Sequence, residues 1–250
     1  MDFEAYAIDL FKAANLDAKK IPESSEKTPD FIIFDDVNIL VEVKEKQDNK
    51  KVIAERDDAF KKGEVFERVQ GLGYKNRLSG IVDDAAKQLK AQKGNTNSEF
   101  CFIFIVMTGL TPSAQISQFA DTLYGKKHVL DAGLTGSIPK ECYYFTHSEF
   151  FKHSDVIDGV FLVKNGYLEL LINDQSPRYD KVINSTFVNR FQGYITDPVK
   201  LEREGKILCV KSDIPRKNED LVKKFVFDKY GIEKGLVFDL PHYSFQAELG

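Results

Sequence analysis

Two carboxylates and a lysine lie near one another in the segment 28–44. Asp30 precedes an apolar run, and Glu42 and Lys44 occupy alternate positions of a second one. Two carboxylates and a backbone carbonyl suit a hard cation such as Mg²⁺, which prefers oxygen ligands. A bound cation polarises a phosphoryl oxygen and lowers the pKa of a coordinated water. Because a nearby lysine can hold or deprotonate that water, these residue types indicate metal-dependent phosphodiester hydrolysis.

The segment that carries these residues has the pattern of a β-hairpin. Two apolar runs, 31–34 and 39–44, flank a polar turn. Side chains alternate along a strand, so Glu42 and Lys44 are expected on one face and the valines between them on the other. The valine face can enter a core, and Asp30 can then approach Glu42 from the neighbouring strand.

The sequences Pro29-Asp30 and Glu42-Val43-Lys44 resemble the two motif elements of the PD-(D/E)xK nuclease superfamily, the restriction-endonuclease-like enzymes. The resemblance extends to the apolar strand expected at 100–107. It implies that Asp30, Glu42 and the carbonyl of Val43 hold Mg²⁺ or Mn²⁺, and that Lys44 orients or activates the attacking water.

The same resemblance assigns roles to two flanking helices. A helix is expected near residues 2–12, where it places Glu4 beside a second metal ion or a metal-bound water. A second helix is expected at 81–93. Its Gln88 would position the scissile phosphate or the water, and its Lys90 could reach a phosphate.

A basic segment separates the hairpin from the second helix. Residues 71–80 are punctuated by glycines, which predicts a loop, and they include Lys75 and Arg77. A basic loop beside the site would suit phosphate contacts, and a charged surface excursion is an equally open interpretation. The net charge is −4, so any nucleic-acid contact must come from such a local patch.

We expect an α/β fold with a restriction-endonuclease-like central mixed sheet flanked by helices. The last hundred residues change character and predict an α+β appendage, so we place a nuclease-like core at 1–150 and the appendage at 151–250. No Pro/Gly/Ser-rich linker separates them, and they can pack as one body. The further elements expected are an Asn-Gly hairpin at 159–172, a helix at 147–157, a helix at 219–230, and strands at 187–195, 207–210 and 236–240.

Other site types lack their motifs. The three cysteines are widely spaced, the four histidines lack ligand spacing, and no nucleotide-binding glycine motif is present. An odd cysteine count without a secretory signal predicts reduced thiols and a cytoplasmic location. The longest apolar run is too short for a transmembrane helix, so no membrane association is expected.

The expected function is therefore a Mg²⁺-dependent nuclease, with a DNA endonuclease of restriction-like or defence type favoured by the resemblance. Cutting both strands of a duplex would favour a homodimer. One alternative is a catalytically inactive module on the same fold that binds nucleic acid or a protein. Another is an accidental motif match, which predicts that Asp30 and Glu42 lie far apart.

Overall fold

A seven-stranded mixed sheet forms the centre of the protein. The computed structural model describes residues 2–22, 28–71, 73–239 and 242–247. The sheet order is β1-β2-β3-β5-β8-β9-β10. Pairing is antiparallel from β1 to β3, parallel from β3 to β8, antiparallel for β8–β9, and parallel for β9–β10. The bounds are β1 Asp17–Lys20, β2 Phe31–Phe34, β3 Asn38–Lys46, β5 Phe100–Met107, β8 Gly159–Lys164, β9 Tyr167–Ile172 and β10 Ile195–Thr196.

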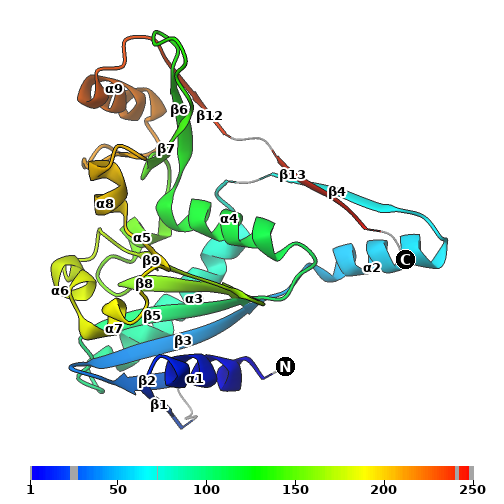
Figure 1. Cartoon of the computed structure of the whole chain (residues 1–250), viewed down its shortest axis with the longest axis vertical. Helices are drawn as coiled ribbons and strands as arrows, with labels where there is room; N and C mark the ends of the chain where they lie inside the picture. Colours follow the sequence, from blue (N-terminus) through cyan, green and yellow to red (C-terminus); the bar gives the residue numbers. More distant parts are fainter. Residues whose placement is uncertain (1, 23–27, 72, 240–241, 248–250) are drawn as a thin grey trace.

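Helices cover both faces of this sheet, as Figure 1 shows. All eight residues of β5 are buried, because its alternate side chains enter two separate cores. One core contains Phe102 and Phe104 of β5 with Phe11 of a first helix, and the other contains Ile103 with Leu89 of another. The helices on the first face are α1 Phe3–Ala13, α6 Tyr179–Ile183 and α7 Thr186–Asn189, and those on the second are α3 Asn76–Lys93, α4 Pro112–Tyr124 and α5 Glu149–Lys152.

A second sheet and a projecting arm extend from this body (Figure 1). The second sheet has the order β11-β7-β6-β12, and the arm pairs β4 with β13 beside α2. The bounds are β6 Lys127–Asp131, β7 Lys140–Tyr143, β11 Leu208–Cys209, β12 Gly235–Phe238, α8 Pro198–Arg203, α9 Glu219–Tyr230, α2 Lys50–Lys61, β4 Phe66–Gly71 and β13 His242–Ala247. Strand β4 also lies near the start of α3, and this places the base of the arm at one end of β3.

The structure confirms an α/β fold with a central mixed sheet flanked by helices. It also confirms the hairpin of β2 and β3, the buried strand β5, the N-terminal helix and the helix that Gly231 closes in a left-handed conformation, with φ 67°. Strands β8 and β9 form the expected second hairpin, but they extend the same sheet as β3 and β5. In the described part of the chain, no helix is long and apolar enough to cross a membrane.

The loop predicted at 71–80 is wrong in its second half, because α3 already begins at Asn76. Leu78, Val82 and Leu89 are all buried at helical spacing. Their burial outweighs the helix-propensity cost of the exposed Gly80, which is about 1 kcal/mol. Arg77 therefore lies in the first turn of a helix, and Lys75 is its N-cap residue.

The strand predicted at 187–195 is also wrong, except at its last residue, where β10 begins with Ile195. Phe187 and Phe191 are four residues apart and pack against Phe161, with ring centroids 6.1 and 4.9 Å away. That spacing suits a helical turn, and the short helix α7 holds Phe187 there. The helix expected at 147–157 is limited to the single turn of α5. The expected strands near 207 and 236 correspond to β11 and β12, whereas residue 240 lies outside the described residues.

Candidate metal centre

Pairing of β2 with β3 brings Asp30 next to Glu42. Phe31 is the partner of Val41 in this antiparallel pair, so Asp30, one residue earlier, meets the residues that follow Val41. The backbone N–H of Val43 donates to Asp30 Oδ2 over 2.7 Å. This hydrogen bond fixes the aspartate carboxylate beside the strand that carries Glu42.

Glu42 is a buried carboxylate with one oxygen left unpaired. Its side chain is 1% exposed, and Lys44 Nζ donates to its Oε1. In the described part of the chain, the buried Oε2 receives no hydrogen bond. Burial raises the pKa of Glu42, the Lys44 ammonium lowers it, and the Asp30 carboxylate raises it, with a net rise from 4.5 to about 7. One lysine therefore does not offset the cost of ionising this group.

Asp30 also carries a poorly compensated charge. Burial raises the pKa of Asp30, the hydrogen bond from Val43 lowers it, and the negative charge of Glu4 raises it, with a net rise. Glu4 lies in the first turn of α1 and pairs with Lys20 of β1 over 2.6 Å. Three carboxylates thus approach one another where β2, β3 and α1 meet.

Lys44 and Gln88 link the strand to α3. Lys44 Nζ donates to Gln88 Oε1 over 2.9 Å, and Gln88 Nε2 donates to the carbonyl of Thr28 over 3.2 Å. The glutamine therefore orients the lysine and also tethers the segment that leads into Asp30. The Lys44 side chain is 24% exposed, so water reaches the site from this side.

The structure thus brings together Asp30, Glu42, Lys44 and Gln88, with Glu4 close by. Val43 donates its backbone N–H to Asp30. The atom of Val43 that the sequence analysis expects to bind the metal is its carbonyl oxygen.

The three cationic residues expected to bind nucleic acid lie elsewhere. Lys75 and Arg77 are at the opposite end of α3 from Gln88. Lys90 is two residues beyond Gln88, is exposed, and pairs with Asp155 over 2.8 Å. Lys75 and Arg77 line a cavity together with the basic side chains of Lys46 and Arg68.

Sequence reasoning missed two contributors to the site. The carbonyl of Thr28 is invisible in a side-chain pattern, although it holds Gln88. Lys20, which the sequence analysis did not single out, ends strand β1 and pairs with Phe31 in the sheet register. Strand β1 has the sequence Asp-Ala-Lys-Lys, which lacks the apolar alternation that would have revealed it.

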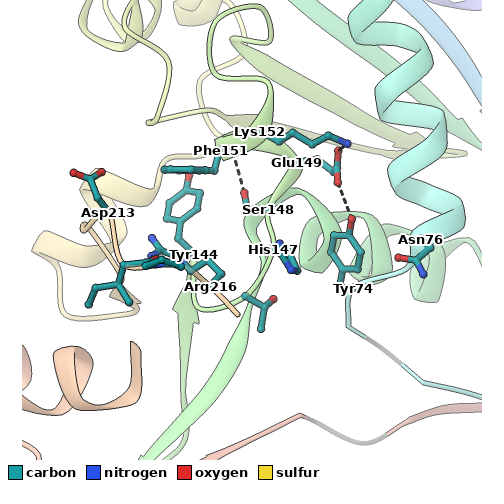
Figure 2. A pocket seen from close by; sticks show the side chains of 13 residues that line it. Tyr74, Asn76, Tyr144, His147, Ser148, Glu149, Phe151, Lys152, Asp213 and Arg216 are labelled. Atoms are coloured by element: carbon teal, nitrogen blue, oxygen red, sulfur yellow. Dashed lines mark hydrogen bonds and ion pairs between the residues drawn. The ribbon is translucent and has the colours of Figure 1, made fainter. Parts of the chain in front are cut away.

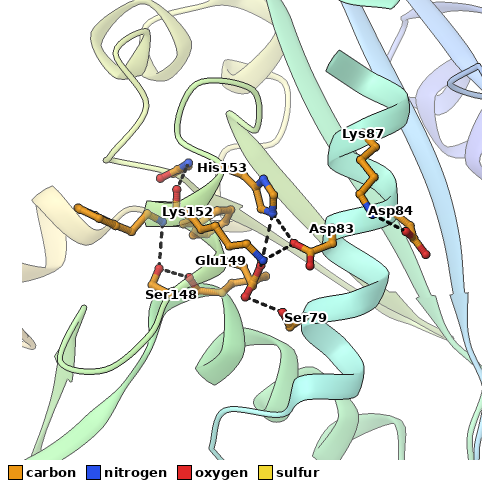
Figure 3. A network of polar contacts seen from close by, with 12 residues as sticks. Ser79, Asp83, Asp84, Lys87, Ser148, Glu149, Lys152 and His153 are labelled. Atoms are coloured by element: carbon orange, nitrogen blue, oxygen red, sulfur yellow. Dashed lines mark hydrogen bonds and ion pairs between the residues drawn. The ribbon is translucent and has the colours of Figure 1, made fainter. Parts of the chain in front are cut away.

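A second group of titratable residues joins α3 to α5, as Figure 3 shows. Asp83 Oδ1 lies 2.6 Å from both Lys152 Nζ and His153 Nε2. The buried Glu149 accepts hydrogen bonds from Ser79 and Tyr74 on Oε1, over 2.7 and 2.8 Å. The ligand atoms of Asp83, Glu149 and His153 lie within 4.8 Å of one another, which is compatible with a metal ion.

The charges of this second group distinguish it from the Asp30–Glu42 site. Burial raises the pKa of Asp83 and of Glu149, but hydrogen bonds from Lys152 to the first and from His153 to the second leave both pKa values lowered. Burial lowers the pKa of His153, but the same two carboxylates leave it raised. The carboxylates therefore already have cationic partners from the chain, and a metal ion would have to displace Lys152.

A cavity of about 510 Å³ lies beside this second group. Tyr74 and Glu149 lie on one side of it and Asp213 on the other (Figure 2). Arg216, also in its wall, donates to the carbonyls of Val210 and Ser212 over 3.2 and 3.0 Å. The hydrogen bonds of Arg216 thus stabilise the loop to which it belongs.

Comparisons with known proteins identify no relative of this chain. A scan against protein-family models finds no matching family, and no curated protein and no solved structure matches the chain.

Proposed function

We propose that this protein is a Mg²⁺-dependent nuclease that hydrolyses phosphodiester bonds at the Asp30–Glu42 site. The observation that carries the proposal is the contact between Asp30 and Glu42, two carboxylates with raised pKa values, where the buried Oε2 of Glu42 accepts no hydrogen bond from the described residues. Such an arrangement is unfavourable without a cation, because charged groups lose hydration on burial and need a counter-charge.

The donor set fits a hard divalent ion. Asp30 and Glu42 supply carboxylate oxygens, and the carbonyl of Val43 would be the third protein ligand. Mg²⁺ and Mn²⁺ both accept such oxygen ligands. When bound, the ion would polarise a phosphoryl oxygen and acidify a water. Glu4, paired with Lys20, would act on a second ion or on a water at the edge of the site.

Lys44 is the group that would act on the attacking water. Its ammonium contacts Glu42 and is held by Gln88, so its position relative to the carboxylates is set from two sides. From there it would orient the water or neutralise the charge that develops on the phosphate. Gln88 would position Lys44 and, through its amide, the scissile phosphate.

The order of elements supports a restriction-endonuclease-like arrangement. A helix bearing Glu4 precedes an antiparallel hairpin bearing Asp30 and Glu42. A helix with the polar Gln88 facing the site follows, and then a buried strand parallel to β3. A nuclease of this arrangement with restriction-like or defence activity on DNA is the specific form that we propose, and a homodimer would suit cleavage of both strands.

A cleavage panel tests the proposal. Single- and double-stranded DNA and RNA are incubated with the protein and Mg²⁺, Mn²⁺ or EDTA. We expect divalent-dependent cleavage that Lys44→Ala abolishes without unfolding the protein. The control Lys87→Ala removes an exposed lysine of α3 that pairs with Asp84, and it should cleave like wild type. Intact substrates under every condition would refute nuclease activity.

A further inference from the structure

A second, cationic pocket lies at the other end of strand β3. It has a volume of about 190 Å³, and its wall includes Lys46, Arg68, Lys75 and Arg77. These four side chains come from β3, β4 and the start of α3. The chain as a whole is acidic, with a net charge of −4, so a convergence of four cations from three elements is a local property of the fold.

The single carboxylate in the wall is already engaged. Asp48 accepts hydrogen bonds from the N–H of Leu110 over 2.5 Å and from Gln115 Nε2 over 3.0 Å. Among the residues that the structure describes, no carboxylate forms an ion pair with Lys46, Lys75 or Arg77.

Arg68 has one distant partner, Glu55, at 3.7 Å. Its Nε is buried and has no hydrogen-bond partner within the described part of the chain. A buried donor without an acceptor costs about 1–3 kcal/mol. An anion in the pocket would supply the missing acceptor.

Lys46 is the most buried of the four cations, at 8% exposure, and it donates to the backbone carbonyl of Gln47. Burial lowers the pKa of Lys46, the positive charge of Arg77 lowers it further, and the negative charge of Asp48 offsets these effects only in part. Asp48 supplies one negative charge in a wall that carries four cationic side chains, so it does not balance them. The pocket thus holds positive charge that an anion would compensate.

The pocket is aligned with the Asp30–Glu42 site. Lys46 is on the same face of β3 as Glu42 and Lys44, because alternate residues of a strand share a face. Four residues at about 3.3 Å each separate Glu42 from Lys46 by about 13 Å along the strand. Helix α3 spans both places, with Gln88 at the first and Lys75 and Arg77 at the second.

We propose that the cationic pocket formed by Lys46, Arg68, Lys75 and Arg77 binds a backbone phosphate of the nucleic acid, on one side of the scissile phosphate. This inference rests on the proposed nuclease function, because that function supplies a polymer whose phosphates repeat along its length. The pocket positions the strand without reading bases, since phosphate contacts fix register and orientation and not sequence. The start of α3 adds to the attraction, because a helix N-terminus favours anions.

Binding measured without cleavage tests this inference. Fluorescence anisotropy of labelled single- and double-stranded DNA and RNA is followed in EDTA over a range of salt concentrations. Arg77→Gln and Lys46→Gln should each weaken binding about tenfold, as loss of one charged hydrogen bond does. The slope of log K against log salt should fall by about 0.7 for single strands or 0.9 for duplex. Lys87→Gln, with the same loss of charge on α3, should leave affinity and slope close to wild type.

The outcomes separate this inference from the nuclease proposal. Pocket-dependent binding without cleavage in any divalent ion would support the pocket and refute the enzyme. If wild type cleaves nucleic acid but Arg77→Gln and Lys87→Gln weaken binding equally, the inference about the pocket is refuted and the nuclease proposal is not. Because Arg77 is exposed, its variant should fold even if Lys46→Gln does not. Two results would overturn the assignment to a nucleic-acid backbone. One is that inorganic phosphate competes with an affinity equal to that of the nucleic acid, and the other is that no nucleic acid binds.

Discussion

Replacing Glu42 with glutamine should stabilise the metal-free protein at neutral and alkaline pH. The glutamine keeps the size of the side chain and an oxygen that can accept from Lys44, but it removes the buried charge. In wild type, burial raises the pKa of Glu42 from 4.5 to about 7. The folded state therefore binds more protons than the unfolded state between these two pH values.

The sign and the size of the effect follow from this difference. Stability falls with rising pH wherever the folded state binds more protons, so wild type loses stability from pH 4.5 upward and reaches the full loss above about pH 7. At about 1.4 kcal/mol per pH unit, the shift corresponds to about 3 kcal/mol. Glu42→Gln should therefore exceed wild type by about 3 kcal/mol near pH 8 and match it near pH 4.5.

Urea unfolding in EDTA at several pH values measures this difference. Glu149→Gln is the matched control, because Glu149 is also buried but its pKa is lowered by its partners. Its variant should be less stable than wild type near neutral pH. Saturating Mg²⁺ should stabilise wild type and not Glu42→Gln, since an ion that binds only the folded state raises its stability. A Glu42→Gln protein that is less stable than wild type near pH 8 would show that the chain already compensates this charge.

Three further substitutions probe the support of the site and the packing of the fold. Gln88→Ala should reduce the cleavage rate roughly 10–100-fold, as loss of an orienting partner does. Cleavage at the wild-type rate would show that Gln88 does not contribute to the site. Asp158→Ala leaves Arg178 without the carboxylate that it contacts over 2.9 Å in the core. Chemical denaturation should show a decrease of about 3–5 kcal/mol in the free energy of unfolding. A decrease below about 1 kcal/mol would show that the ion pair behaves like an exposed one. Gly235→Ala would place a Cβ 2.0 Å from Phe227 Cζ; a lower melting temperature should report a cost of about 1–3 kcal/mol, whereas an unchanged one would show that the ring moves freely.

The local part of the site could be predicted from the sequence. The apolar runs around 35–38 define a hairpin, and a hairpin fixes which residues of its two strands face one another. This is why Asp30 and Glu42 converge as expected, and why Lys44 lies on the face of Glu42. The buried strand β5 could also be predicted, because an unbroken apolar run is typical of a strand that is packed against on both faces.

The remaining parts depend on contacts between segments far apart in the sequence. Lys46 and Arg68 belong to one pocket only because the arm returns β4 to the end of β3. Asp83 and His153 meet because α5 packs beside α3, and no spacing of histidines signals it. The strand predicted at 187–195 fails because Phe187 and Phe191, four residues apart, both pack on Phe161 of a distant strand, which suits a helical turn.

Direct titration with Mn²⁺ is the closest test of the central claim, that Asp30 and Glu42 together hold a divalent ion. Calorimetry or the loss of the free Mn²⁺ spin-resonance signal reports binding without any substrate. Wild type should bind Mn²⁺, and Asp30→Asn should not. Asp83→Asn, in the group that already has Lys152 as its cation, should bind like wild type. Binding that survives Asp30→Asn and is lost in Asp83→Asn would place the ion at the other group of carboxylates and contradict the account.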